Sequence, residues 1–168
     1  RNVFDDLRAA LDVDKANVQT VSRLDRPELH YHIRETTNAR RLEDLHRILI
    51  EVDERHGRGV GKPSAFALRG EDSVCGIVFS NTKAARNSHS NAGCESVRQS
   101  LASHGVRADT YHSGRGEERA SIQERFLANE FTVMVATKSF GMGVNKRNVR
   151  YTIHVNLPWS IESFYQEA

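Results

Sequence analysis

The order of predicted strands and helices indicates an α/β domain built on a mostly parallel sheet. Two apolar runs, 74–80 and 131–136, are continuous instead of alternating, which is typical of strands buried on both faces of a parallel sheet. Segments whose apolar residues recur at helical spacing lie between the predicted strands. The sequence therefore predicts a parallel sheet flanked by helices.

In the first part of the chain, the pattern predicts one strand, one helix and one loop. Residues 28–33 alternate and include Tyr and Ile, which favours a strand. Residues 38–57 place leucines at helical spacing, with Asn38 as the N-cap and Gly57 as the stop signal. The segment near 57–73 has neither pattern, and we expect it to form a loop insertion.

The rest of the chain predicts alternating strands and helices. The apolar run 74–80 is the first strand of this part, and Ile122 and Phe126 are expected to point inward from a later helix. The further elements, in order, are a helix ending at Gly105, a short strand over 106–112, a helix over 117–130, strands over 131–137 and 148–155, and a helix capped by Ser160.

Composition and charge exclude some classes of protein and favour others. The 168 residues are 38% hydrophobic and 27% charged, which suits one soluble globular domain. Nothing approaches the run of ~18 apolar residues that a membrane span needs. Two distant cysteines exclude a disulfide scaffold, and a cytoplasmic setting, nucleoid-associated if bacterial, is expected. The chain does not start with Met, so we expect it to be a piece of a longer protein.

Basic residues are concentrated in one half of the sequence. Residues 83–150 contain 11 Lys/Arg and 6 Asp/Glu, a net charge of +5, whereas the rest of the chain carries −3. This asymmetry is compatible with a polyanionic partner on one side, although a solvated surface would explain it equally well.

Three polar loops follow three of the predicted strands. They are "SNTK" at 80–83, "HSGRG" at 112–116 and "TKSFGMG" at 137–143. In parallel sheets, ligands gather at the carboxyl ends of the strands. All three loops are small, polar, basic or glycine-containing, so we expect a ligand site at this edge.

Other site types are less well supported by the sequence. The segment "HGRGVGKPS" resembles a nucleotide-phosphate loop, but His56 and Pro63 stand where Gly and Ser/Thr are needed. Neither a nucleophile elbow nor a zinc-protease motif is present, and the eight histidines are better explained by surface or capping roles.

The three loops are suited to binding phosphate. Hydroxyl groups and free backbone amides hold phosphate oxygens, and glycines at 141 and 143 let the backbone approach closely. Lys138 and Lys146 add electrostatic attraction. Spaced along one sheet edge, such loops are suited to follow successive phosphates of a single nucleic-acid strand.

Several segments of the chain resemble the motifs of a known family. The segments "GIVFSNTK", "ADTYHSGRG" and "VMVATKSFGMGVNKRNVRYTIHVNLPWSIESFYQEA" resemble the motifs of the second motor domain of RecQ-type superfamily-2 DNA helicases. The segment "LDRPELHYHI" resembles the start of that domain. The resemblance implies a RecA-like domain over residues 23–168, preceded at 1–22 by a lead-in from the first motor domain.

The resemblance also implies roles for individual residues. On the DNA strand it places motif IV residues, a histidine of the "YHSG" segment and the start of motif V: Ser80, Asn81, Lys83, His112, Thr137, Lys138 and Ser139. Toward the nucleotide it places the end of motif V and the first residue of motif VI: Gly143, Asn145, Lys146 and Gln166. Arg115 stands where the family usually has an apolar residue, which leaves the local fit to be explained.

The resemblance implies ATP and Mg²⁺ as cofactors, held mainly by a preceding RecA-like domain. Single-stranded or unwinding DNA is the expected partner. Phosphoryl transfer needs a phosphate loop, a magnesium carboxylate and an arginine, so the isolated chain is expected to be inactive. Roles in DNA repair and recombination are implied for the intact protein. The alternatives are a nucleic-acid-binding module without motor activity and a related superfamily-2 translocase on RNA or DNA.

Overall fold

The computed structural model describes residues 10, 29–57, 64–83, 92–138, 140, 144–157, 160 and 164. The chain divides into two units, Arg1–Arg34 and Glu35–Ala168, and the sheet belongs to the second. In the first unit, residues 29–33 form neither helix nor strand, so the strand predicted at 28–33 is wrong for these residues. Alternation of side chains gives a segment two faces, but a strand also needs hydrogen bonds to a neighbouring strand.

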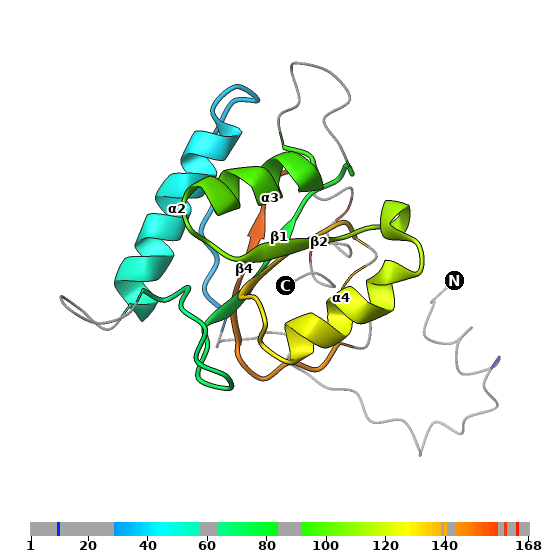
Figure 1. Ribbon diagram of the computed structural model, residues 1–168. Coiled ribbons are helices and arrows are strands. Elements are labelled where there is room, and N and C mark those ends of the chain that lie inside the picture. Colours follow the sequence, from blue (N-terminus) through cyan, green and yellow to red (C-terminus); the bar gives the residue numbers. More distant parts are fainter. Residues whose placement is uncertain are drawn as a thin grey trace. The chain divides into compact units, whose positions relative to one another are not determined.

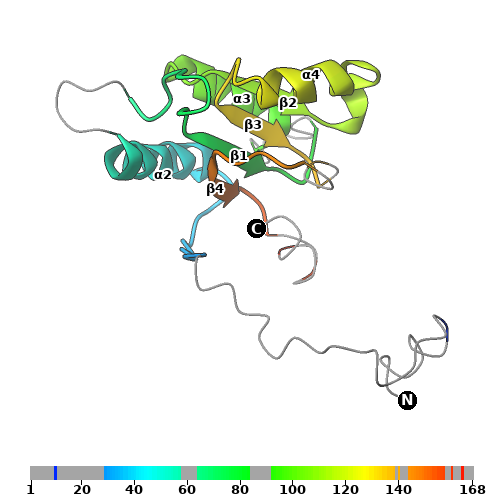
Figure 2. The same ribbon diagram turned by 90° about the horizontal axis from the view of Figure 1, so that it is seen from below.

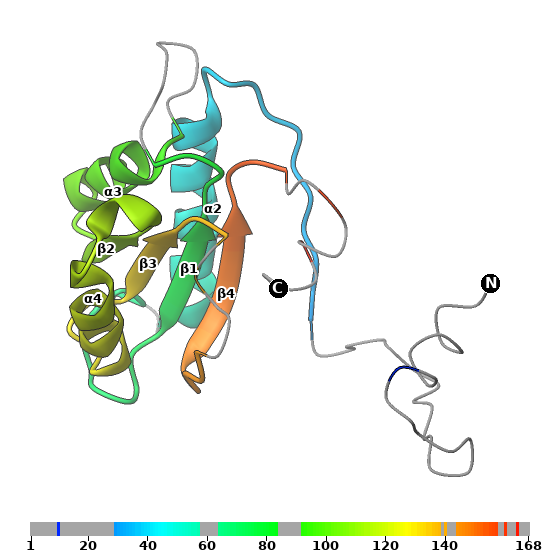
Figure 3. The ribbon, with the colours of Figure 1, turned by 90° about the vertical axis from the view of Figure 1, so that its right-hand side faces the viewer.

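The second unit contains a four-stranded sheet with the order β2-β3-β1-β4 (Figure 1). The strands are β1 (Cys75–Phe79), β2 (Ala108–Tyr111), β3 (Val133–Ala136) and β4 (Val149–His154). Every pairing is parallel, with β1 between β3 and β4. Figure 3 shows the arrows of β1, β3 and β4 pointing the same way. The predicted parallel sheet is confirmed.

Helices cover both faces of this sheet (Figure 2). The helices α2 (Arg41–His56) and α3 (Cys94–Ser103) pack on one face, and α4 (Glu118–Leu127) packs on the other. Within β3, Val133 and Val135 lie in the core under α2 and α3. Met134 lies in the core under α4 with Ile122 and Phe126, as predicted for these two residues. The continuous apolar run of β3 therefore follows from burial on both faces.

Glycines end two helices, as the sequence predicts. Gly57 is the C-cap of α2, and Gly105 has a φ of 75° just after α3, in the left-handed region that glycine adopts without strain. The start of α2 differs from the prediction, because Arg40 is its N-cap and Asn38 lies in a preceding turn. Among the residues with described positions, no helix is long and apolar enough to cross a membrane.

Residues 64–73 are irregular, as predicted, but side-chain hydrogen bonds attach them to α2. The carboxylate of Asp53 accepts hydrogen bonds from Ser64 Oγ at 2.9 Å and from the Ala65 amide at 2.6 Å. Ala65 is almost fully buried. This part of the predicted insertion is therefore packed on the domain, and residues 58–63 lie outside the described range.

A bulge in β4 determines how this edge strand packs. Cys75 pairs with Val149 and Gly76 pairs with Tyr151, so Arg150 is an extra residue in the ladder. Beyond the bulge, Tyr151 packs in the core under α2 and α3. A Cβ at Gly76 would lie 2.1 Å from the Tyr151 ring, so only glycine leaves room for this ring.

Candidate nucleic-acid interface

The three predicted loops begin side by side at the carboxyl edge of the sheet. The ladder continues one residue past the strands, because the Ser80 amide donates to the Ala136 carbonyl at 2.9 Å and the Thr137 amide donates to Tyr111 at 3.1 Å. The Val155 amide donates to the Phe79 carbonyl at 3.0 Å, which brings the chain after β4 to the same edge. The predicted clustering of the three loops is confirmed for the residues that the structure describes.

Ser80 faces the protein and not the solvent. It is 2% exposed, and its hydroxyl donates to the Ala92 carbonyl at 2.5 Å. The same oxygen accepts from the Thr82 amide at 3.4 Å. The hydroxyl therefore shapes the loop after β1 and is turned away from the surface where a nucleic-acid strand is predicted to bind.

Asn81 connects the loop after β1 to the loop after β4. Its backbone amide donates to Asn156 Oδ1 at 3.2 Å, and its side-chain amide donates to the Leu157 carbonyl at 3.1 Å. Both asparagines are thus part of one polar connection at the edge. Sequence reasoning missed Asn156, which is 75 positions away from Asn81 and carries no motif signal of its own.

The start of α3 is closed by carbonyl groups from the loop after β1. The Cys94 amide donates to the Thr82 carbonyl at 2.9 Å, and the Glu95 amide donates to the Lys83 carbonyl at 3.3 Å. These two amides of the first turn are therefore not offered to a phosphate. The side chain of Lys83 is exposed and remains the basic group of this loop.

His112 is buried and orients the loop after β2. It is 6% exposed, its Nδ1 accepts from the Gly114 amide at 3.1 Å, and its Nε2 lies 3.4 Å from Glu95 Oε1. Because Nδ1 accepts, the neutral ring carries its proton on Nε2 and donates it to the carboxylate. His112 is therefore a support for the loop, which corrects its predicted direct contact with DNA.

Glu95 receives three side-chain donors. Oε1 accepts from Thr110 Oγ1 at 2.9 Å as well as from His112, and Oε2 accepts from Arg98 Nε at 3.1 Å. Burial opposes ionisation of this carboxyl, but the hydrogen bonds outweigh it and hold the pKa of Glu95 below its ordinary value. A charged carboxylate thus stands behind the predicted interface. Sequence reasoning did not identify it.

Arg115 is accommodated by an acidic partner. Its guanidinium lies 2.9 Å from Asp109 and 3.5 Å from Glu118. Asp109 also pairs with Arg125 at 2.9 Å. The basic residue at this position is therefore accommodated by two acidic partners, Asp109 on the preceding strand β2 and Glu118 at the start of α4.

Thr137 and Lys138 lie at the carboxyl edge, as predicted. Thr137 is half-buried, and its carbonyl accepts from the Phe140 amide at 3.0 Å, which turns the chain directly after β3. Lys138 is exposed at this turn. Ser139, the third residue predicted to contact DNA here, lies outside the described residues.

Lys146 lies at the opposite, amino-terminal edge of the sheet. Its ammonium donates to Asn129 Oδ1 at 2.6 Å and to the Leu127 carbonyl at 3.3 Å, both at the end of α4. Asn129 Oδ1 also accepts from Asn148 Nδ2 at 2.8 Å, just before β4 begins. The end of α4 therefore supplies the partners of this ammonium, and the predicted nucleotide contact of Lys146 stays a prediction.

The described residues do not form a nucleotide site by themselves. Asn145 is exposed, whereas Gly143 and Gln166 lie outside the described residues. Within the described ranges, no cluster of three His, Cys, Asp or Glu side chains is suited to a metal ion. Among the described residues, therefore, only Asn145 of the predicted nucleotide set is exposed and not hydrogen-bonded to the end of α4.

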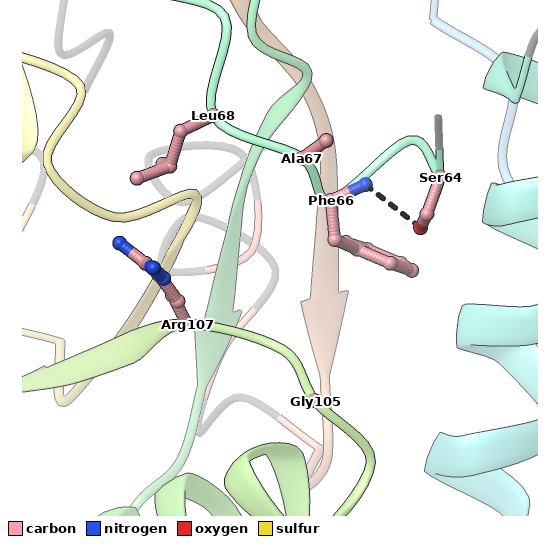
Figure 4. Close-up of a pocket in the computed structure, with 6 residues that line it drawn as sticks. All are labelled: Ser64, Phe66, Ala67, Leu68, Gly105 and Arg107. Atoms are coloured by element: carbon pink, nitrogen blue, oxygen red, sulfur yellow. Dashed lines mark hydrogen bonds between the residues drawn. The ribbon is translucent and has the colours of Figure 1, made fainter. Parts of the chain in front are cut away.

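A shallow cavity of about 400 Å³ lies near the amino edge (Figure 4). Segment 64–68 lines one side of it, and Gly105 and Arg107 line the other. The Phe66 carbonyl accepts from Thr132 Oγ1, just before β3, which fixes the cavity at this end of the sheet. None of the predicted site residues lines it, so it does not belong to the interface.

Comparison with known proteins identifies related sequences. Residues 65–168 match the family described as "Helicase conserved C-terminal domain". The chain is 41% identical over 103 residues, 61% of its length, to ATP-dependent DNA helicase Q5 from Rattus norvegicus. It is 39% identical over 100 residues, 59% of its length, to ATP-dependent DNA helicase RecQ from Pasteurella multocida. It is 33% identical over 168 residues, 99% of its length, to ATP-dependent DNA helicase Q1 from Rattus norvegicus. The aligned parts are 10%, 15% and 23% of these relatives, so the chain spans less than a quarter of each.

Solved structures share the fold. The Hef helicase domain of Pyrococcus furiosus superposes with a TM-score of 0.51 at 20% identity, over 76% of this chain and 22% of that one. The RNA-helicase Prp28 of Chaetomium thermophilum, bound to ADP, gives 0.54 at 23% identity, over 79% and 26%. At these identities the likeness concerns the fold alone. It confirms the RecA-like fold expected from the sequence.

Proposed function

Because the chain belongs to the helicase conserved C-terminal domain family, we propose that it is the second motor domain of a RecQ-like ATP-dependent DNA helicase. Its role is to bind the backbone of a single DNA strand at the carboxyl edge of the sheet. The observation that carries this proposal is the convergence of three loops at one edge, where Asn81, Lys83 and Lys138 are exposed.

The arrangement is suited to a phosphate backbone and not to reading bases. The exposed side chains are those of Asn81, whose amide also donates to the Leu157 carbonyl, and of two lysines, whose ammonium groups bind phosphate oxygens regardless of sequence. Behind them, Ser80 and His112 are buried and hydrogen-bonded within the protein. These hydrogen bonds therefore order the loops before a strand binds, which lowers the entropy cost of binding.

In this proposal, ATP and Mg²⁺ are held mainly by a preceding motor domain of the same protein. The described residues supply no complete nucleotide site. Of the predicted nucleotide set they include Asn145, which is exposed, and Lys146, which is hydrogen-bonded to Asn129 at the end of α4. The isolated chain is accordingly proposed to be inactive as an ATPase. Roles in DNA repair and recombination, and a cytoplasmic location, are proposed from the resemblance to RecQ helicases.

The test removes the edge groups and measures binding of the intact protein to labelled oligothymidylate across a salt series. We expect the double variant Thr137→Ala, Lys138→Ala to bind more weakly. The plot of the logarithm of the binding constant against the logarithm of the salt concentration should become less steep by about 1, because the charged phosphate contact of Lys138 is lost. Arg147→Ala is the matched control. It removes one exposed positive charge at the opposite edge and should leave binding unchanged. Equal affinities of the double variant and the wild type would contradict the edge assignment.

Two further measurements separate the proposal from its alternatives. DNA-stimulated ATP hydrolysis by the intact protein distinguishes a motor from a binding module without motor activity. Competition between single-stranded DNA and RNA of the same length distinguishes a DNA helicase from a translocase on RNA. We expect hydrolysis to depend on DNA and DNA to compete better than RNA.

A further inference from the structure

We infer that Glu95 is a positioning residue that holds the loop after β1 and the loop after β2 in a fixed relation at the candidate interface. This inference rests on the proposed function, since it concerns the same strand-binding edge. Glu95 itself is not proposed to touch nucleic acid.

The backbone of Glu95 holds the first loop. Its amide donates to the Lys83 carbonyl at 3.3 Å, next to the bond from Cys94 to Thr82 at 2.9 Å. The carbonyl groups of the loop after β1 therefore cap the start of α3. This fixes the direction of the chain at Lys83, whose side chain is exposed at the edge.

The carboxylate of Glu95 holds the second loop. Oε1 accepts from Thr110 Oγ1, inside β2, and from His112 Nε2, directly after it. This bond selects the tautomer of His112 in which Nδ1 is free to accept from the Gly114 amide. The chain of contacts therefore runs from the carboxylate through the imidazole to the backbone of the loop.

The two loops meet at Gly114. A Cβ added there would lie 3.0 Å from His112 Nδ1 and 3.6 Å from Cδ of Lys83, so the lysine stem runs beside the glycine. Glu95 thus binds the backbone of Lys83 directly. Through His112 it also holds the backbone of Gly114, which lies beside the Lys83 side chain. Without the carboxylate, the first loop keeps its bonds to α3, but the second loop loses its connection to that helix.

The experiment compares Glu95→Ala with Glu95→Gln in the intact protein. Glutamine keeps an acceptor oxygen for His112 and Thr110, and it loses the negative charge and the second oxygen that accepts from Arg98. Glu124→Ala is the matched control, because it removes an exposed carboxylate on α4. Binding is measured with labelled oligothymidylate. The state of His112 is followed by nitrogen NMR of labelled histidine, and the Gly114 amide by hydrogen exchange.

We expect Glu95→Ala to bind about two- to tenfold more weakly, because the second loop must then be ordered on binding. In this variant the Nε2 proton of His112 should exchange with water, so that its NMR signal disappears. The Gly114 amide should also exchange faster. Glu95→Gln should restore most of the affinity and the His112 signal. Wild-type behaviour of Glu95→Ala in these measurements would overturn the inference.

The proposed function and this inference fail in different ways. If Thr137→Ala, Lys138→Ala weakens binding and Glu95→Ala does not, the inference is wrong and the proposed function stands. If neither set changes affinity but Glu95→Ala alters His112 and Gly114, the positioning role stands and the strand-binding role of the edge is wrong.

Discussion

Replacing Lys146 tests whether this lysine serves nucleotide binding or the fold. Its ammonium is hydrogen-bonded to Asn129 and Leu127 and lies 5.0 Å from the centre of the Phe126 ring. Lys146→Met keeps an apolar stem of similar length and removes the charge. We therefore expect this variant to lose stability and to keep nucleotide affinity.

The size of the effect follows from opposing contributions. A hydrogen bond to a charged group stabilises a protein by about 1.5–3 kcal/mol, and an ammonium over an aromatic ring adds about 0.5–1 kcal/mol. Burial of the ammonium lowers the pKa of Lys146, because the charged group loses hydration. This loss of hydration offsets part of the stabilisation. We expect a net loss of about 1–2 kcal/mol in the free energy of unfolding.

Urea unfolding followed by circular dichroism measures this loss on the 168-residue chain, and binding of a fluorescent ATP analogue to the intact protein measures nucleotide affinity. Lys138→Met is the matched control, because Lys138 is exposed at the carboxyl edge, and it should change stability by less than about 0.5 kcal/mol. An unchanged unfolding midpoint together with weaker nucleotide binding in Lys146→Met would refute the reasoning and restore the role implied by the sequence.

Two further predictions concern the core. Gly76→Ala should lower the free energy of unfolding by about 1–3 kcal/mol, because the new Cβ would lie 2.1 Å from the Tyr151 ring. The loss should be much smaller in a Tyr151→Val background, as urea unfolding of the wild type, both single variants and the double variant would reveal. Equal losses in both backgrounds would exclude this clash. Burial lowers the pKa of His154 from its usual 6.5, so the folded chain favours the neutral ring, and stability should fall as pH drops below 6.5 toward the lowered value. Urea midpoints over this range should depend less on pH in His154→Phe, and an identical dependence would assign the effect to other groups such as His56, whose pKa is also lowered by burial.

The fold was largely predictable because its signals are local. Continuous apolar runs such as 131–136 indicate strands buried on both faces, and glycines such as Gly105 indicate helix ends. The strand expected at 28–33 was wrong for the described residues 29–33, because alternation does not reveal whether a partner strand is present. The start of α2 was misplaced by two residues, because Asn38 belongs to a turn that the capping signal resembles.

The site was only partly predictable because side-chain direction depends on distant residues. The order of the motifs correctly brings three loops to one edge. It does not reveal that Ser80 and His112 point into the protein, since their partners Ala92 and Glu95 are 12 and 17 positions away. A lone glutamate or asparagine in a polar segment carries no pattern of its own, so Glu95 could be found only from the structure.

The segment from Thr137 to Asn148 joins the two edges of the sheet, and this decides how its motif must be understood. Each residue of β3 advances the strand by about 3.3 Å, so the edges before and after Val133–Ala136 are more than about 10 Å apart. Thr137 leaves at the carboxyl edge, whereas Lys146 and Asn148 are bound at the amino edge. Between them, Phe140 is buried against Tyr111 on the α4 face, which attaches the segment to the core midway. Residues that are close in the motif are therefore divided between two ends of the domain. Thr137 and Lys146 are therefore too far apart to hold one phosphate between them.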